Sequence, residues 1–200
     1  MGKRKLEKAI GLYRERHPDG PEPAVRWLPF QLNPDLPESG IPREDYVARK
    51  FGARGKGVNE RVTMAGRQVG IPFAYEKMEV QPNTLNAHRL MIYAEREGRQ
   101  DEMAEELFRA HFIEGASLVD RETLADIAAR AGLDRKAAAG YLASEEDRAL
   151  IAQADAEARN AGIGGVPFFI FNRKVGISGA QDPDTLLEAM EQALRDSEEV

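Results

Sequence analysis

The residues with the clearest chemical pattern are Gly164-Gly165-Val166-Pro167, which lead directly into the apolar run at 168–171. A proline cannot donate a hydrogen bond to a sheet, so it belongs at the first position of a strand or on an exposed edge. An X-Pro bond is also the kind that readily adopts the cis form. The pattern predicts a strand headed by Pro167, and we expect the Val166–Pro167 bond to be cis. The alternative is an ordinary trans proline that only starts the strand.

Other reactive groups are scarce, because the 200 residues contain no cysteine. Thiolates are the nucleophiles of disulfide exchange and common metal ligands, so this composition excludes disulfides, thiolate metal sites and self-contained thiol chemistry. His88 and His111 are predicted on separate helices without carboxylates at ligand spacing, and packed helix residues are the simpler interpretation. We therefore predict no catalytic residue, no metal site and no cofactor.

Two further polar positions are candidates for substrate binding. Gly179, Ala180, Gln181 and Asp182 precede a predicted helix, whose free N–H groups and dipole favour an anion. Alternatively, Asp182 only caps that helix and Gly179 only makes a turn. Asn33 follows a predicted strand at the sheet end where sites gather in α/β folds, so it is a candidate contact to a polar substrate.

The elements that must position these residues lie at the two ends of the chain. Helical spacing predicts a helix over 3–16, and a short strand follows at 25–30. Strands at 168–171 and 175–178, joined by a turn at 172–174, precede a last helix over 182–194. Nearly everything between Arg43 and Gly162 is predicted to be helical, most clearly over 83–98, 100–114, 120–131, 134–143 and 144–161. Asp120 is the predicted N-cap of its helix and Gly132 the predicted C-cap. We therefore predict an α/β domain from 1–38 and 163–200, interrupted by a helical domain over 39–162.

Composition and charge narrow the class of partner. The net charge of −6 and the pI near 5.3 argue against nucleic-acid binding, because phosphate contacts need clustered Lys and Arg. No apolar run approaches the ~20 residues that span a bilayer. Residues 1–6 are basic but lead into an amphipathic helix rather than an apolar signal-peptide core, so we expect a cytoplasmic protein with no membrane partner.

The order of elements resembles a thioredoxin fold with an inserted helical domain, as in the DsbA family. The FrnE-like branch is most similar, and the 2-hydroxychromene-2-carboxylate isomerases and kappa-class glutathione transferases are related to it. The resemblance spans essentially the whole chain. It rests on six short segments in the family's order: 2–7 (GKRKLE), 29–34 (PFQLNP), 83–84 with 87–90 (NT and AHRL), 107–112 (LFRAHF), 164–169 (GGVPFF) and 178–181 (SGAQ).

The resemblance fails at the front of the chain. FrnE-like proteins carry C-P-W-C-Y-x-G-K-R, and Gly2-Lys3-Arg4 match only its end. The resemblance implies that the first strand and both cysteines are missing. Either the N-terminus is incomplete, or the protein is naturally shortened. We expect the former, because in this fold the segments 25–30 and 168–171 would face each other across a gap one strand wide. Each backbone group left buried and unpaired there would cost about 1–3 kcal/mol.

Three functions follow from the resemblance. The first is a thiol–disulfide oxidoreductase or isomerase acting on protein or peptide dithiols and disulfides. In it Val166, beside Pro167, offers its backbone to an extended substrate. Without cysteine, this chain is expected to be redox-inactive as it stands. The alternatives are a glutathione-dependent isomerase or transferase, with the γ-glutamyl carboxylate near 179–182, and a non-catalytic peptide-binding module. A homodimer or a strand-swapped assembly is also expected.

Overall fold

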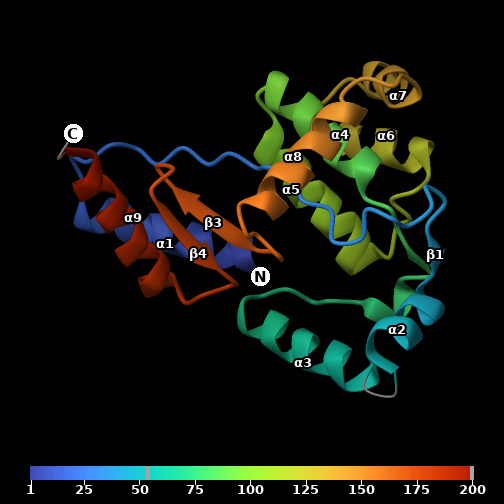
Figure 1. The fold of residues 1–200 in the computed structure, drawn as a ribbon, viewed down its shortest axis with the longest axis horizontal. Helices are drawn as coiled ribbons and strands as arrows, with labels where there is room; N and C mark the ends of the chain where they lie inside the picture. The colour runs from blue at the N-terminus through green and yellow to red at the C-terminus, as the bar shows by residue number, and fades with distance from the viewer. Residues whose placement is uncertain (53–54, 199–200) are drawn as a thin grey trace. The chain divides into compact units, whose positions relative to one another are not determined.

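The computed structural model describes residues 1–52 and 55–198, and it divides into two compact units. One unit, here the terminal unit, is formed by Met1–Val25 and Gly162–Val200 (Figure 1). The other, the helical unit, is formed by Arg26–Ala161. The chain therefore leaves the first unit after one helix and returns to it for its last three elements.

The terminal unit contains two helices and one β-hairpin. Helix α1 (Gly2–Arg16) comes first, and the strands β3 (Phe168–Phe171) and β4 (Val175–Ser178) and the helix α9 (Pro183–Glu198) follow after the helical unit. The strands are antiparallel, with Phe169 opposite Ile177. The hairpin turns at the predicted place, where Asn172 and Arg173 adopt left-handed backbone angles.

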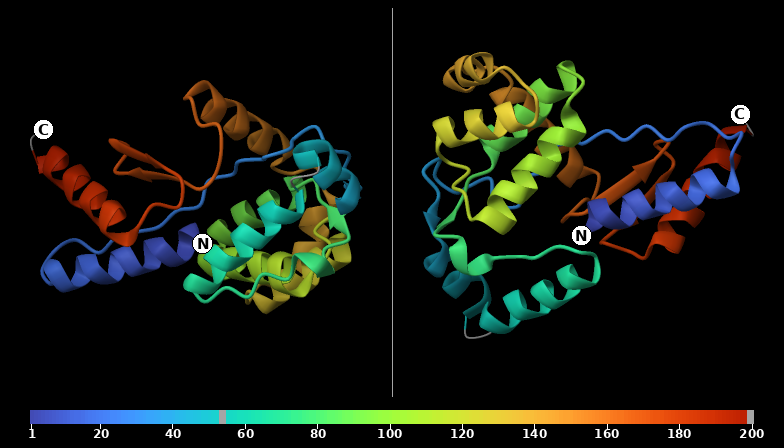
Figure 2. Two further views of the ribbon diagram at one scale, coloured as in Figure 1. Left: turned by 90° about the horizontal axis from the view of Figure 1, so that it is seen from below. Right: turned by 180° about the vertical axis from the view of Figure 1, so that it is seen from behind.

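The core of the terminal unit explains why α1 and α9 lie together. Ala9, Ile10 and Tyr13 repeat at helical spacing on α1 and are buried against Leu186, Leu187 and Met190. From the hairpin, Phe169, Phe171 and Ile177 pack against the same cluster. Since alternate strand residues point to the same side of a sheet, both helices cover one face of the β3–β4 hairpin (Figures 1 and 2).

The helical unit is built almost entirely from helices (Figure 2). Two short strands of this unit, β1 (Ile41–Pro42) and β2 (Val80–Gln81), pair antiparallel with each other. Its helices are α2 (Arg43–Phe51), α3 (Gly55–Gln68), η2 (Tyr75–Lys77), α4 (Leu85–Arg96), α5 (Gln100–Arg109), η3 (Ala110–Glu114), α6 (Arg121–Arg130), α7 (Arg135–Ala143) and α8 (Arg148–Asn160). Within the described residues, no helix is both long and apolar enough to cross a membrane.

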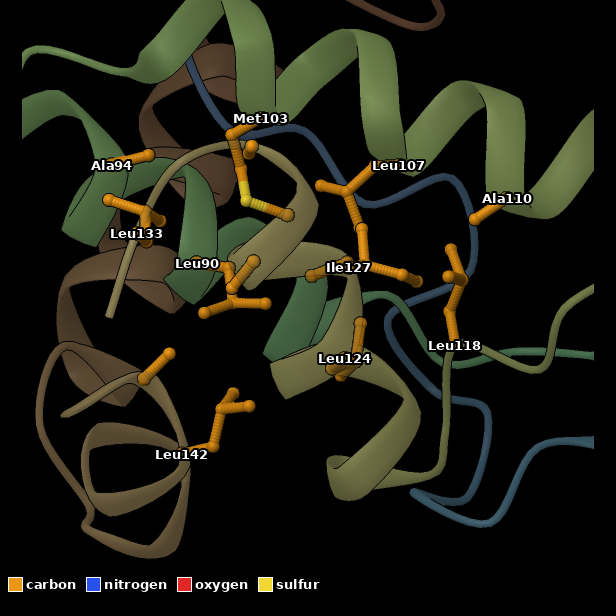
Figure 3. Packing of buried hydrophobic residues seen from close by; sticks show 14 of the residues in the cluster. Leu90, Ala94, Met103, Leu107, Ala110, Leu118, Leu124, Ile127, Leu133 and Leu142 are labelled. Atoms are coloured by element: carbon orange, nitrogen blue, oxygen red, sulfur yellow. The ribbon is translucent and has the colours of Figure 1, made fainter. Parts of the chain in front are cut away.

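One hydrophobic cluster packs the helices α4, α5, α6 and α7 together, and it includes the fully buried Leu90, Met103 and Leu124 (Figure 3). The helix ends around it follow local signals. Asp120 accepts a hydrogen bond from the Thr123 N–H at 2.9 Å, which confirms the predicted N-cap of α6. Gly132 follows the same helix with a φ of +88°, a conformation that favours glycine.

The predicted strand at 25–30 is wrong, because this segment belongs to no sheet. Its polar backbone groups bond to side chains instead. The Trp27 N–H donates to Oε1 of Gln100 at 2.9 Å, and the Gln100 side-chain amide donates to the Trp27 carbonyl at 3.0 Å. A helix side chain, that of Gln100, therefore takes the place of a partner strand at Trp27.

Two further hydrogen bonds tie the segment after Trp27 to helix α8, so it groups with the helical unit. Asp155 accepts from the Gln31 N–H at 2.8 Å, and Arg159 donates to the Gln31 carbonyl at 2.5 Å. Residues 26–38 therefore group with the helical unit, whereas the sequence placed them with the chain ends. As limits of domains that fold separately, 1–38 with 163–200 and 39–162 stay a prediction.

Two of the predicted helices have different bounds in the structure. The helix expected over 100–114 is α-helical only to Arg109 and continues as the π-helical turn η3. The helix expected from Ser144 begins at Arg148, because Asp147 has a left-handed backbone. The Asp147 carboxylate accepts from the Tyr141 hydroxyl at 2.6 Å, and this contact holds the turn in place.

Candidate functional site

The loop before β3 exposes Val166 to solvent. The Val166–Pro167 peptide bond is cis, and Val166 is 51% exposed. The Pro167 carbonyl accepts a hydrogen bond from the Gly179 N–H at 2.9 Å, which ties the loop to the segment after β4. The loop is thus anchored on one side and accessible at the residue that precedes the proline.

The N-terminus of α1 lies directly against this proline. A Cβ atom added to Gly2 would lie 2.8 Å from Cγ of Pro167 and 3.3 Å from Cζ of Phe169. Because a proline ring cannot move aside as a flexible side chain does, only glycine permits this approach. The first turn of α1 therefore reaches the Val166–Pro167 loop.

Replacing Gly2 with alanine is expected to destabilise the terminal unit. The added methyl group overlaps the Pro167 ring, and such overpacking typically costs about 1–3 kcal/mol. The control is Gly11→Ala on the same helix, where an added Cβ meets nothing within 4 Å. That change should stabilise α1 by roughly 0.5–1 kcal/mol. Thermal unfolding of both variants measures the difference. Equal shifts of the unfolding midpoint would contradict the close contact between Gly2 and Pro167.

The start of α1 is electropositive. Its first turn holds no acidic residue, and no side chain caps it. Lys3 and Arg4 both bond to Glu7, with 3.0 Å between Nη1 of Arg4 and Oε2 of Glu7. Burial alone would raise the pKa of Glu7, but the hydrogen bonds from Lys3 and Arg4 outweigh it and lower the pKa. Because Glu7 already pairs with both cations, it is the helix dipole that favours negative charge beside Pro167.

A second cationic contact ties the segment 179–182 to α1. Nζ of Lys5 donates to the Ala180 carbonyl and to Oδ1 of Asp182, at 2.9 Å in each case. The Gln181 side-chain amide donates to the Ser178 carbonyl at 2.9 Å. The Asp182 carboxylate therefore faces a lysine of α1. Lys5 carries no signal in the sequence, because nothing local indicates a pair so far apart in the chain.

The structure brings most of the predicted site residues into the terminal unit. Val166 and Pro167 lie in its loop, and Gly179 bonds that loop at the start of the segment 179–182. Asn33 lies in the helical unit, where its amide donates to the Tyr46 hydroxyl at 3.3 Å. Its role as a substrate contact stays a prediction.

Both helix histidines are packed rather than poised for chemistry. Burial lowers the pKa of His88 to about 4, although a hydrogen bond with the Phe30 backbone acts in the opposite direction. Burial also lowers the pKa of His111 to about 4, and its Nδ1 has no hydrogen-bond partner. Across residues 1–52 and 55–198, no three His, Asp or Glu side chains lie close enough together to hold a metal ion.

The comparisons with known proteins identify the family. The family model described as the DSBA-like thioredoxin domain matches residues 1–191. The chain belongs to this family. It is also similar to the crystal structure of a probable DsbA oxidoreductase from Streptomyces coelicolor, with 27% identity and a TM-score of 0.84, covering 96% of this chain and 83% of that chain. No curated protein matches it.

Membership in the DsbA family confirms the predicted fold class, a thioredoxin-like fold with a helical insertion. The helices α2 to α8 lie in the helical unit, and α1, β3, β4 and α9 lie in the terminal unit. That these units are the insertion and the thioredoxin-like domain stays a prediction. The family and the similar structure also support a role within the thiol–disulfide oxidoreductases.

Proposed function

We propose that this DsbA-family chain binds an extended polypeptide at the Val166–Pro167 loop as part of thiol–disulfide exchange. With no cysteine in its 200 residues, it neither oxidises nor reduces thiols by itself. The observation that carries the proposal is the contact between the start of α1 and Pro167, beside an exposed Val166. A polypeptide bound at Val166 would thus lie next to an electropositive helix end.

Disulfide exchange needs a bound substrate, a stabilised thiolate and the thiolate itself. The attacking group is a thiolate, and a helix N-terminus stabilises a thiolate by lowering its pKa. The start of α1 supplies that electrostatic environment, with no acidic residue in its first turn. The Val166 backbone supplies a donor and an acceptor for strand-like pairing with the substrate. This chain therefore has a backbone that can bind substrate and a helix N-terminus that can stabilise a thiolate, but it has no nucleophile.

Binding of S-carboxymethylated insulin B chain, an extended polypeptide with blocked cysteines, tests the proposal. We expect it to shift the amide resonance of Val166 in a saturable way. Binding by the variants is read at the Gly165 and Phe168 amides, because Val166→Pro has no amide at position 166. Val166→Pro removes the N–H donor and should abolish the saturable shift there, whereas the control Val166→Thr keeps the donor and should bind. In a metal-free insulin reduction assay, all three proteins should match the reaction without protein. Turnover above that level, or undiminished binding by Val166→Pro, would contradict the proposal.

The glutathione-dependent alternative makes a different prediction at residues 179–182. Lys5 already pairs with the Asp182 carboxylate and the Ala180 carbonyl, so an anion bound here would meet the charge of Asp182 and compete with it for Lys5. We therefore favour the polypeptide. Saturable binding of reduced glutathione that is lost in Lys5→Met would put the alternative ahead.

Several finer features belong to the same proposal and stay predictions. They are the FrnE-like branch, a cytoplasmic location, and a homodimer or strand-swapped assembly. The non-catalytic peptide-binding module differs from the main proposal only in lacking any link to thiol chemistry.

A further inference from the structure

Arg43 lies partly buried in the helical unit, and no carboxylate pairs with it in the described part of the chain. Its Nη1 donates to Oε1 of Gln81 at 2.8 Å, and its guanidinium lies over the Tyr75 ring, 5.3 Å from the ring centre. Burial lowers the pKa of Arg43, and the groups that act against this effect are two tyrosines, Tyr75 and Tyr46. The positive charge is thus removed from water toward neutral side chains.

Other arginines of the helical unit that are removed from water have partners that offset the loss. Arg148 is also partly buried, and it pairs with the carboxylates of Glu38 and Glu145. The fully buried Arg89 donates to several backbone carbonyls. A sheltered charge without such partners costs free energy, because nothing replaces the water that it has lost. Arg43 is therefore set apart by a missing counter-charge.

The β1–β2 ladder brings Arg43 to Gln81. Pro42 lies opposite Val80 in this ladder, and the Arg43 N–H donates to the Glu79 carbonyl at 2.9 Å. The start of α2 is thereby fixed beside the end of β2. The position of the guanidinium is set by backbone pairing rather than by a flexible loop.

A cluster of aromatic rings adjoins the guanidinium. The Ala74 N–H donates to the Phe112 carbonyl at 2.9 Å, which ties η2 to η3. The rings of Tyr75 and Phe112 meet edge to face at 6.3 Å, and Phe73 stacks on Tyr75 at 5.3 Å. All three rings are partly exposed. Arg43 therefore lies at the border of an aromatic surface that a ligand can reach.

His111 is a second group near Arg43 that lacks an expected partner. It is 8% exposed, and its Nδ1 has no hydrogen-bond partner in the described part of the chain. Burial lowers the pKa of His111 to about 4, and the charge of Arg43 acts in the same direction. At pH 7 the imidazole is therefore neutral and adds no second positive charge. It belongs to η3, a π-helical turn of the kind that often occurs at functional sites.

One guanidinium beside neutral rings fits a ligand with a single negative charge. A carboxylate carries one charge and matches the planar fork of a guanidinium. A phosphate monoester carries close to two charges at pH 7. Glu44 and Asp45, which follow Arg43 in α2 and are exposed, would repel the second charge. The neighbouring rings favour an apolar body next to the carboxylate.

We propose that Arg43 binds the carboxylate of a ligand whose aromatic body lies against Tyr75, Phe73 and Phe112. The ligand supplies the counter-charge that the described chain does not. Small aryl carboxylic acids and the C-terminal residue of a polypeptide share this chemistry, and the experiment separates these two sources. The inference does not rest on the proposed function, which concerns the terminal unit.

The probe is phenylacetate, added to the full chain at pH 7 and followed by calorimetry and by the amide resonances of Arg43 and Tyr75. We expect saturable binding with a dissociation constant of about 1 mM or lower. Phenylacetamide lacks the charge and acetate lacks the ring, so each should bind about tenfold more weakly or worse. Phenyl phosphate should bind more weakly than phenylacetate.

The variants separate Arg43 from general positive charge. Arg43→Gln removes the guanidinium and should weaken phenylacetate binding by about tenfold or more. The control is Arg49→Gln, which removes the same charge from an exposed position of α2 and should bind normally. Arg43→Lys keeps the charge in case Arg43→Gln fails to fold, and the loss of the planar fork should weaken binding about threefold or more.

The two sources of the carboxylate are distinguished with the peptide acetyl-Gly-Gly-Phe. Tighter binding of its free acid than of phenylacetate identifies the carboxyl terminus of a polypeptide as the source. Tighter binding of phenylacetate identifies a small acid. Both results support the proposal, provided that the C-terminal amide of the peptide binds about tenfold more weakly than its acid.

Four results would overturn the proposal. Equal binding of phenylacetamide and phenylacetate would show that the carboxylate is not recognised. Normal binding by the Arg43 variant that folds would place the carboxylate at another positive site, such as the start of α1. Equal losses in Arg43→Gln and Arg49→Gln would indicate attraction to net charge. Tighter binding of phenyl phosphate would show that the site takes a dianion, and the proposed ligand class would be wrong.

Discussion

A cysteine substituted for Met1 is expected to be far more ionised at neutral pH than an ordinary thiol, with a pKa below about 7.5 instead of the usual value near 8.5. Met1 is the N-cap of α1, and no acidic residue lies in the first turn. The helix dipole there favours the thiolate. The pH dependence of alkylation by iodoacetamide measures this pKa, in a protein that carries a short tag ahead of position 1.

The matched control is Gly11→Cys, in the middle of the same helix. An added Cβ there meets no atom within 4 Å, so the thiol lies in open space. Its pKa should stay near 8.5, and at pH 7 its thiolate fraction should be about tenfold or more below that of Met1→Cys. The same pKa for both thiols would show that the start of α1 gives no electrostatic help, and the proposed function would lose its support.

Sequence patterns predicted the parts of the site that depend on neighbours in the chain. Pro167 heads an apolar strand because its ring and the residues after it act locally. Asp120 caps its helix because the accepted N–H belongs to Thr123, three residues on. The resemblance to the DsbA family then placed these elements in one fold, which the family comparison confirms.

The features that the sequence did not reveal depend on distant partners. The segment 25–30 has the composition of a strand, but a strand exists only where another backbone pairs with it, and the Trp27 backbone bonds to Gln100 instead. The contact of Gly2 with Pro167 and the pair of Lys5 with Asp182 join the two ends of the chain. Periodicity within one segment carries no information on such pairings.

Arg89, fully buried in the helical unit, is the side chain whose loss should cost most stability. Its guanidinium donates to the backbone carbonyls of Tyr141 at 2.8 Å, Ser144 at 2.9 Å and Glu146 at 2.8 Å, and it lies over the Tyr141 ring at 4.9 Å. These acceptors belong to the end of α7 and the turn before α8. We expect Arg89→Ala to lower the free energy of unfolding by about 3–5 kcal/mol, because it leaves several buried carbonyls unsatisfied and opens a cavity.

Arg96→Ala on the same helix is the control, because it removes the same charge from an exposed position. Arg96 pairs with Glu146 and Asp147, at 2.7 Å each, but its side chain is 46% exposed. Such pairs contribute about 1 kcal/mol or less. The free energy of unfolding of Arg89→Lys should lie between those of the two alanine variants. An ammonium keeps the charge, but it cannot make the several hydrogen bonds of the planar guanidinium. Urea unfolding at pH 7 measures all three. Similar values for Arg89→Ala and Arg96→Ala would mean that the carbonyls around Arg89 find other donors, and that this arginine does not hold the turn between α7 and α8.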